Sequence, residues 1–161
     1  MLKSALGLLA SGVMAGCVML VPVPQPNGIT RTVPATVETT GFGGMMNDLR
    51  ATQNLVGLGL DPRLTQAAQA HAEHMAQAGY FSHQSPGGPN GADLTARIRA
   101  AGCVAGAMGE NIAQGQRSEA AVFAAWQASP KHLQAMLGPR YRSYGLGRSG
   151  DIWVLTFADG C

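Results

Sequence analysis

The chain has 161 residues, 46% of them hydrophobic, so it is long enough for one domain with a real core and too short for two. The formal net charge is +2, and the Lys and Arg residues are scattered singly rather than gathered in a basic stripe. We therefore expect no nucleic-acid partner, because the electrostatic footprint that binds phosphate backbones is missing.

The N-terminal stretch MLKSALGLLASGVMAGC has the layout of an export signal, with one positive charge, an apolar run and two small residues before Cys17. Its end resembles the bacterial lipoprotein cleavage box, although Met14 stands where that box usually has Leu. We predict a signal peptide over 1–16 and a lipidated Cys17 that holds the protein on a membrane. The alternative is an uncleaved anchor helix over 4–23, which its glycines disfavour.

The segment after the cysteine, residues 17–43, is rich in Pro, Thr and Gly and has no helical period. Such a composition is typical of an extended linker. We predict a tether over 17–43 that connects the membrane to a single globular domain over 44–161.

Two long helices are predicted at the start of this domain. Apolar residues at steps of three and four indicate a first helix over 45–56, with Gly57 as its stop. Asp61 as N-cap and Pro62 at the first helical position open a second helix, which Gly79 ends.

Three shorter helices follow. Asp93 is placed to cap a helix over 94–101, and Ser118 is placed to cap the next one. Pro130, directly after a serine, begins the last helix, which carries His132.

The last stretch, YGLGRSGDIWVLTFADGC, alternates in polarity around a turn at Ser149 and Gly150, which indicates a β-hairpin. Helices thus precede and bracket a few strands. This order indicates the α+β class rather than a regular βαβ alternation.

Cys103 and Cys161 remain once Cys17 is assigned to lipidation. In an exported protein they lie in an oxidising compartment, so we expect them to form a disulfide bond. Two free thiols are the alternative.

Three segments carry polar residues where the local pattern favours apolar or turn residues: SHQS around His83, MGENIA around Glu110 and SPKH around His132. Each signal is weak by itself. A single histidine is more often structural than a ligand, and Glu110 could be an ordinary loop carboxylate.

Five segments in order resemble a known family: NDLR, LTQAAQAHAEHMAQAGYFSH, GENIAQG, AAWQASPKHLQAMLGPRYRSYGLG and IWVLTFADG. Together they are similar to the bacterial branch of the CAP superfamily, the SCP-like proteins related to cysteine-rich secretory proteins, antigen 5 and plant pathogenesis-related proteins. The resemblance covers residues 45–161. It implies an α-β-α sandwich, in which a small antiparallel sheet is covered by helices on both sides.

The resemblance also implies a cleft that holds two histidines and two acidic residues. By motif, the histidines are His83 and His132, and the first acid is Glu110. The second acid of many relatives falls at Ser129 here, so the set is incomplete.

Two imidazoles and a carboxylate from distant segments allow three roles. His83 and His132 could ligate a divalent cation such as zinc, with Glu110 as a third ligand or as a hydrogen-bond partner of a ligand. They could act as a general acid and base, because histidine titrates near neutral pH. They could also simply hydrogen-bond three loops together.

No nucleophile accompanies these residues. Ser82, Ser85 and Ser129 each have a turn or cap role that explains them, and the chain has no Gly-x-Ser-x-Gly motif. His71 and His74 are spaced by three on the second helix, but they do not complete an HExxH pattern. We interpret both as residues at the edge of the core or on the surface.

We therefore expect an exported protein of the bacterial cell envelope, lipid-anchored, whose domain is a ligand-binding or interaction module. Its ligand could be a lipid, a glycan or a protein. Two alternatives remain open: a metal-assisted or acid/base hydrolase acting on envelope material, and a structural surface domain without a ligand.

Overall fold

A computed structural model describes residues 20–23, 31–34 and 41–161. The chain divides into two units, residues 1–38 and 39–161, and each is described by itself. In the first unit, β1 (Leu20–Val23) pairs antiparallel with β2 (Arg31–Pro34), within the segment predicted as a tether. The predicted signal peptide and Cys17 lie outside the described residues. No helix in the described ranges is long and apolar enough to cross a membrane.

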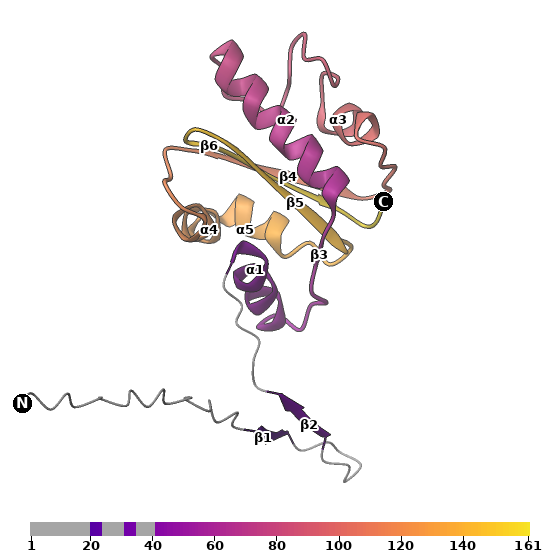
Figure 1. Ribbon diagram of the computed structural model, residues 1–161, viewed down its shortest axis with the longest axis vertical. Helices are drawn as coiled ribbons and strands as arrows, with labels where there is room; N and C mark the ends of the chain where they lie inside the picture. The colour runs from indigo at the N-terminus through magenta and orange to yellow at the C-terminus, as the bar shows by residue number, and fades with distance from the viewer. Residues whose placement is uncertain (1–19, 24–30, 35–40) are drawn as a thin grey trace, which may run out of the picture. The chain divides into compact units, whose positions relative to one another are not determined.

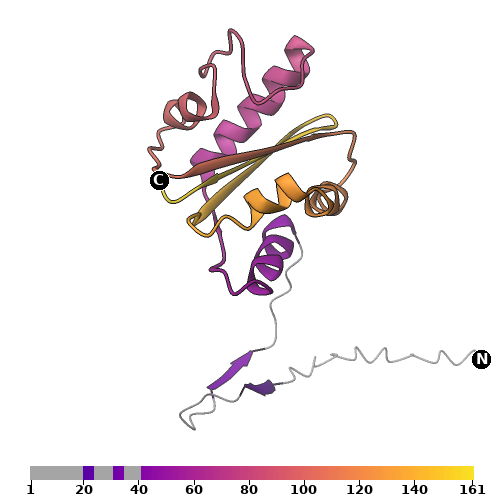
Figure 2. The same ribbon diagram turned by 180° about the vertical axis from the view of Figure 1, so that it is seen from behind.

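The second unit is a three-layer α-β-α sandwich, as predicted (Figures 1 and 2). Its sheet has the strand order β3-β5-β6-β4. Helices α2 (Pro62–Ala78) and α3 (Leu94–Ala100) cover one face. The other face is covered by α1 (Phe42–Ala51), α4 (Glu119–Ala128) and α5 (Pro130–Met136). The strands are β3 (Gly59–Leu60), β4 (Met108–Gln114), β5 (Ser143–Ser149) and β6 (Ile152–Ala158). The expectation of an antiparallel sheet was wrong in one pair, because β3 runs parallel to β5.

Helix α2 (Pro62–Ala78) begins and ends where the sequence predicts. The Asp61 side chain accepts a hydrogen bond from the main-chain N–H of Arg63 at 2.8 Å, which satisfies a free donor of the first turn. Gly79 ends the helix in the left-handed conformation, with φ of 69°, which glycine adopts without a Cβ clash.

Helix α1 (Phe42–Ala51) differs from the predicted range 45–56 at both ends. At its start, the N–H of Phe42 donates to the Glu119 carboxylate at 2.9 Å, and the Phe42 ring packs edge-on against Trp126. At its end, the buried Arg50 guanidinium donates to the main-chain oxygen of Met136 at 2.8 Å. Partners from α4 and α5 therefore help to fix the helix position.

The shorter helices are α3 (Leu94–Ala100), α4 (Glu119–Ala128) and α5 (Pro130–Met136). Asp93 and Ser118 cap α3 and α4 as predicted. Ser129 precedes α5, but its side chain makes no capping hydrogen bond.

Two glycines of β5 let α2 lie close against the sheet. A Cβ atom on Gly145 would collide with the main chain of Leu64 and Thr65, and one on Gly147 with the main chain of Ala68 and Gln69.

The hydrophobic core has one part on each face of the sheet. On the α1, α4 and α5 face it includes Met46, Phe123, Trp126, Trp153 and Phe157, and on the α2 face it includes Leu64, Ala68, Met75, Ile98 and Val154.

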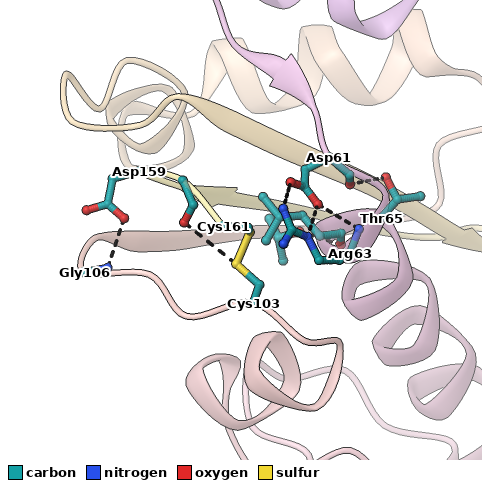
Figure 3. The surroundings of a disulfide bond; sticks show 10 residues. Asp61, Arg63, Thr65, Cys103, Gly106, Asp159 and Cys161 are labelled. Atoms are coloured by element: carbon teal, nitrogen blue, oxygen red, sulfur yellow. Dashed lines mark hydrogen bonds and ion pairs between the residues drawn. A yellow bond between two sulfur atoms is a disulfide. The ribbon is translucent and has the colours of Figure 1, made fainter.

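A disulfide bond joins Cys103, just after α3, to Cys161, the pair expected from the sequence (Figure 3). The same end of the sheet is stabilised by Asp159, whose carboxylate accepts the main-chain N–H groups of Gly106 and Ala107 at 3.0 and 2.9 Å. The disulfide and these hydrogen bonds fix the loop between α3 and β4 to the end of the chain.

Candidate functional site

Glu110 lies in the middle of β4, not in a loop. The sequence did not predict this strand, because GENIA has no clean alternation of polar and apolar residues. The Glu110 side chain is only 3% exposed, and both of its carboxylate oxygens have partners. Oε1 lies 2.9 Å from His83 Nδ1, and Oε2 accepts a hydrogen bond from Arg97 Nη2 at 2.7 Å. The buried negative charge is therefore paired with a guanidinium, as burial of a carboxylate requires.

Arg97, on α3, is the central residue that sequence reasoning missed. Its buried guanidinium also donates to the main-chain oxygen of His83 at 3.1 Å and to Ser85 Oγ at 2.9 Å. Arg97 thus connects three segments: α3, β4 and the loop that follows α2. An arginine in the last turn of a short helix is common, so nothing in its local sequence distinguishes it.

His83 lies on that loop, and its side chain is 55% exposed. Since a carboxylate accepts only, Nδ1 carries the proton that is shared with Glu110. In the neutral ring, Nε2 then presents a lone pair to solvent. Glu110 and Arg97 hold the loop and the ring, while the reactive edge of the imidazole stays accessible.

His71, on α2, belongs to the same network, which the sequence did not reveal. It is 1% exposed, and its Nε2 lies 3.0 Å from the main-chain oxygen of Ser82 and 3.9 Å from Glu110 Oε1. Its Nδ1 lies 3.0 Å from Ser85 Oγ. These partners favour the neutral ring with its proton on Nε2. Desolvation by burial lowers the pKa of His71, although the nearby Glu110 charge opposes the shift.

His132 lies near this network, and within residues 41–161 its ring makes no hydrogen bond. Its main-chain oxygen accepts from Asn111 Nδ2 at 3.0 Å, so the residue after Glu110 fixes the position of α5. Burial first, and then electrostatic repulsion by the nearby His83, lower the pKa of His132. The fold thus brings all three predicted residues into one neighbourhood, with a direct contact between His83 and Glu110.

The arrangement does not fit a three-ligand metal site. Within residues 41–161, no group of three His, Cys, Asp or Glu side chains is placed to hold a metal ion. Glu110 is already neutralised by Arg97, so only the imidazoles of His83 and His132 remain as candidate ligands. A catalytic zinc normally has three protein ligands.

The serines have different roles. Ser82 Oγ accepts the N–H of Gln84 at 3.1 Å, the predicted turn role. The Ser85 side chain instead lies in the buried network between His71 and Arg97. Among the described residues, no serine, threonine or cysteine side chain is hydrogen-bonded to His83. His74 lies outside the network, 2.7 Å from the Tyr80 hydroxyl.

The fold agrees with comparisons to known proteins. The model of the cysteine-rich secretory protein family, CAP, matches residues 44–154. The chain therefore belongs to the CAP family.

Two bacterial relatives illustrate the similarity. An uncharacterized protein of Bacillus subtilis, YkwD, is 32% identical over 134 residues, which cover 82% of this chain and 49% of the relative. A crystal structure of an extracellular, SCP-domain protein from Bacillus anthracis is similar with a TM-score of 0.68 and 26% identity, over 73% of this chain and 38% of that one. The chain thus spans about half the length, or less, of these two relatives.

A third comparison concerns the fold alone. An outer surface protein from Borrelia burgdorferi is similar with a TM-score of 0.63 and 24% identity, over 72% of this chain and 87% of that one. The Bacillus anthracis neighbour is described as an extracellular protein and the Borrelia burgdorferi neighbour as an outer surface protein.

Proposed function

We propose that this protein is anchored in the cell envelope by a lipidated Cys17 and that its CAP domain binds a polar envelope ligand through His83. The 2.9 Å contact between His83 Nδ1 and Glu110 Oε1 carries this proposal. It holds the ring in one orientation and leaves Nε2 as a hydrogen-bond acceptor at the surface. Hydroxyl and amide groups, which are abundant in envelope glycans and their peptides, are the matching donors.

The ligand proposal is tested with soluble peptidoglycan fragments. We expect the His83 Cε1–H resonance to shift in a saturable way as fragments are added to the full chain, and His83→Ala to abolish binding. His74→Gln is the matched control, since that imidazole is hydrogen-bonded to Tyr80 rather than to Glu110. Undiminished binding by His83→Ala would contradict the proposal.

A second candidate, hydrolysis, is favoured by the same contact. A carboxylate that fixes the tautomer of an exposed imidazole is also the arrangement of a general base, which could activate water. Binding is preferred because the second acid of the family's cleft falls at Ser129 and no described nucleophilic side chain is bonded to His83, so a hydrolase would depend on one imidazole and water. Chromatography of the same incubations separates the two: new products that disappear in His83→Ala would establish the hydrolase.

The anchor is tested independently. We expect metabolic labelling with a fatty acid to mark the protein and to be lost in Cys17→Ser. Labelling that persists in this variant would contradict lipidation at Cys17. The uncleaved anchor helix would then be the better explanation.

A further inference from the structure

A cavity of about 510 Å³ lies where β5 turns into β6, beside the C-terminal end of α2. Small-molecule sites typically measure roughly 300–1,000 Å³. None of the three residues His83, Glu110 and His132 lines this cavity, so it is not part of the candidate site. The residues that line the cavity include Met75, Tyr80, Phe81, Gln114, Asp151 and Ile152.

The charge of the cavity is negative. Asp151 is the only charged residue that lines it, and within residues 41–161 its carboxylate has no ion-pair partner. The C-terminal end of α2 adds partial negative charge. Gly79 and Tyr80 both donate their N–H to the Met75 oxygen, the later carbonyls have no described main-chain donor, and the last turn holds no basic residue. This end of a helix favours a cation.

Within residues 41–161 the nearest basic side chain in sequence, Arg148, forms no ion pair with Asp151, although its Nε donates to the main-chain oxygen of Gly150 at 2.7 Å. The Arg148 guanidinium lies 4.4 Å from the centre of the Trp153 ring. Trp153 packs in the core of the α1, α4 and α5 face, whereas the cavity is bounded by α2 and by Ile152 of the opposite core.

The remaining walls suit an organic cation rather than a bare ion. Phe81, 46% exposed, and its neighbour in sequence Tyr80 both line the cavity. Aromatic rings attract ammonium groups, most strongly where water is partly excluded. Met75 and Ile152 are buried and give the cavity an apolar floor, and the Gln114 amide can accept an N–H or O–H.

We propose that this cavity binds a small organic cation, an alkylammonium or quaternary ammonium group, with its charge at Asp151 and its apolar body against Phe81.

The test is a calorimetric titration of the full chain with choline, with propylamine and with dimethylbutanol, the neutral carbon isostere of choline. We expect at least one cation to bind roughly tenfold more tightly than the isostere, and Asp151→Asn to remove this difference. Phe81→Ala should weaken binding by roughly fivefold. Both substitutions are at exposed residues, so they should leave the fold intact.

Asp48→Asn is the matched control, because it removes one exposed carboxylate on α1. It should bind like the wild type. His83→Ala should also bind the cation normally, which separates this proposal from the proposed function. The proposal would be overturned if neither cation binds more tightly than the isostere, if the difference persists in Asp151→Asn, or if neither cation gives saturable heat.

Discussion

Arg97 Nη2 donates to Glu110 Oε2 at 2.7 Å, with both side chains almost fully buried. This ion pair connects α3 to β4 and, through the second carboxylate oxygen, holds the exposed His83. Removal of one partner from a buried pair leaves an uncompensated charge. The pair therefore matters both for the stability of the domain and for the orientation of His83.

Arg97→Met should lower the free energy of unfolding by about 3–5 kcal/mol, because the Glu110 charge would be left buried and unpaired. Urea denaturation followed by tryptophan fluorescence measures this. The double variant Arg97→Met, Glu110→Gln should recover part of the loss, because the charge is then removed as well. A double variant as unstable as the sum of the two single changes would show that the pair is not coupled.

Gly147→Ala should destabilise the domain by about 1–3 kcal/mol or more. The Cβ of the new alanine would collide with the main chain of α2, which cannot move aside as a side chain can. The control is Gly59→Ala, where the nearest atom to the added Cβ would be the Arg142 main-chain oxygen at 4.0 Å. Thermal unfolding of the two variants should differ clearly. Equal melting temperatures would contradict the close approach of α2 and β5.

Locally determined elements could be predicted from the sequence. The ends of α2 depend on Asp61, Pro62 and Gly79, which lie within or next to the helix. The ends of α1 could not be predicted, because Phe42 bonds to a residue 77 positions away and Arg50 to one 86 positions away. Only the folded topology brings such partners together.

The candidate site shows the same division. His83, Glu110 and His132 stood out as polar residues in unusual local positions, and the family resemblance placed them together. Arg97 and His71 gave no such signal, because an arginine near a helix end and a histidine on an apolar stripe are both ordinary. Their roles depend on the contacts with Glu110, which no local pattern encodes.

The Cys103–Cys161 disulfide closes a loop with a sequence separation of 58. The chain-entropy relation gives about 4 kcal/mol for a loop of this length. We expect the double variant Cys103→Ala, Cys161→Ala to lose up to this amount in urea denaturation, with the far-UV circular dichroism of the folded state unchanged. Both cysteines are replaced together, because a single substitution would leave its partner as a free thiol. An unchanged unfolding midpoint in the double variant would contradict the prediction.

Zinc should bind the domain only weakly, because His83 and His132 supply two nitrogens and Arg97 already neutralises Glu110. Calorimetry on wild type, His132→Ala and the control His74→Ala measures this. We expect any heat to be small and to require a large excess of zinc. A submicromolar dissociation constant that is lost in His132→Ala and kept in His74→Ala would show that the side chains rearrange into a metal site.

The stability of the domain should decrease as the pH falls below the ordinary histidine value of 6.5, because burial lowers the pKa of His71 in the folded state. The unfolded chain then binds more protons than the folded one, and stability decreases with falling pH wherever this holds. The charged groups near His71 are Glu110, which opposes the shift, and Arg97 and His83, which favour it. The loss should therefore begin near the unfolded pKa and continue until the folded pKa is passed.

Urea denaturation at several pH values between about 7.5 and 5 measures this slope. His71→Gln should make the slope shallower, because the residue that gains a proton on unfolding is gone. His132 also has a lowered pKa, so part of the slope should persist in this variant and decrease further in the double variant with His132→Gln. His74→Gln is the comparison at a partly buried imidazole outside the network. If His71→Gln and His132→Gln both show the same dependence of the unfolding free energy on pH as the wild type, protonation of these rings does not limit the stability of the domain at acidic pH.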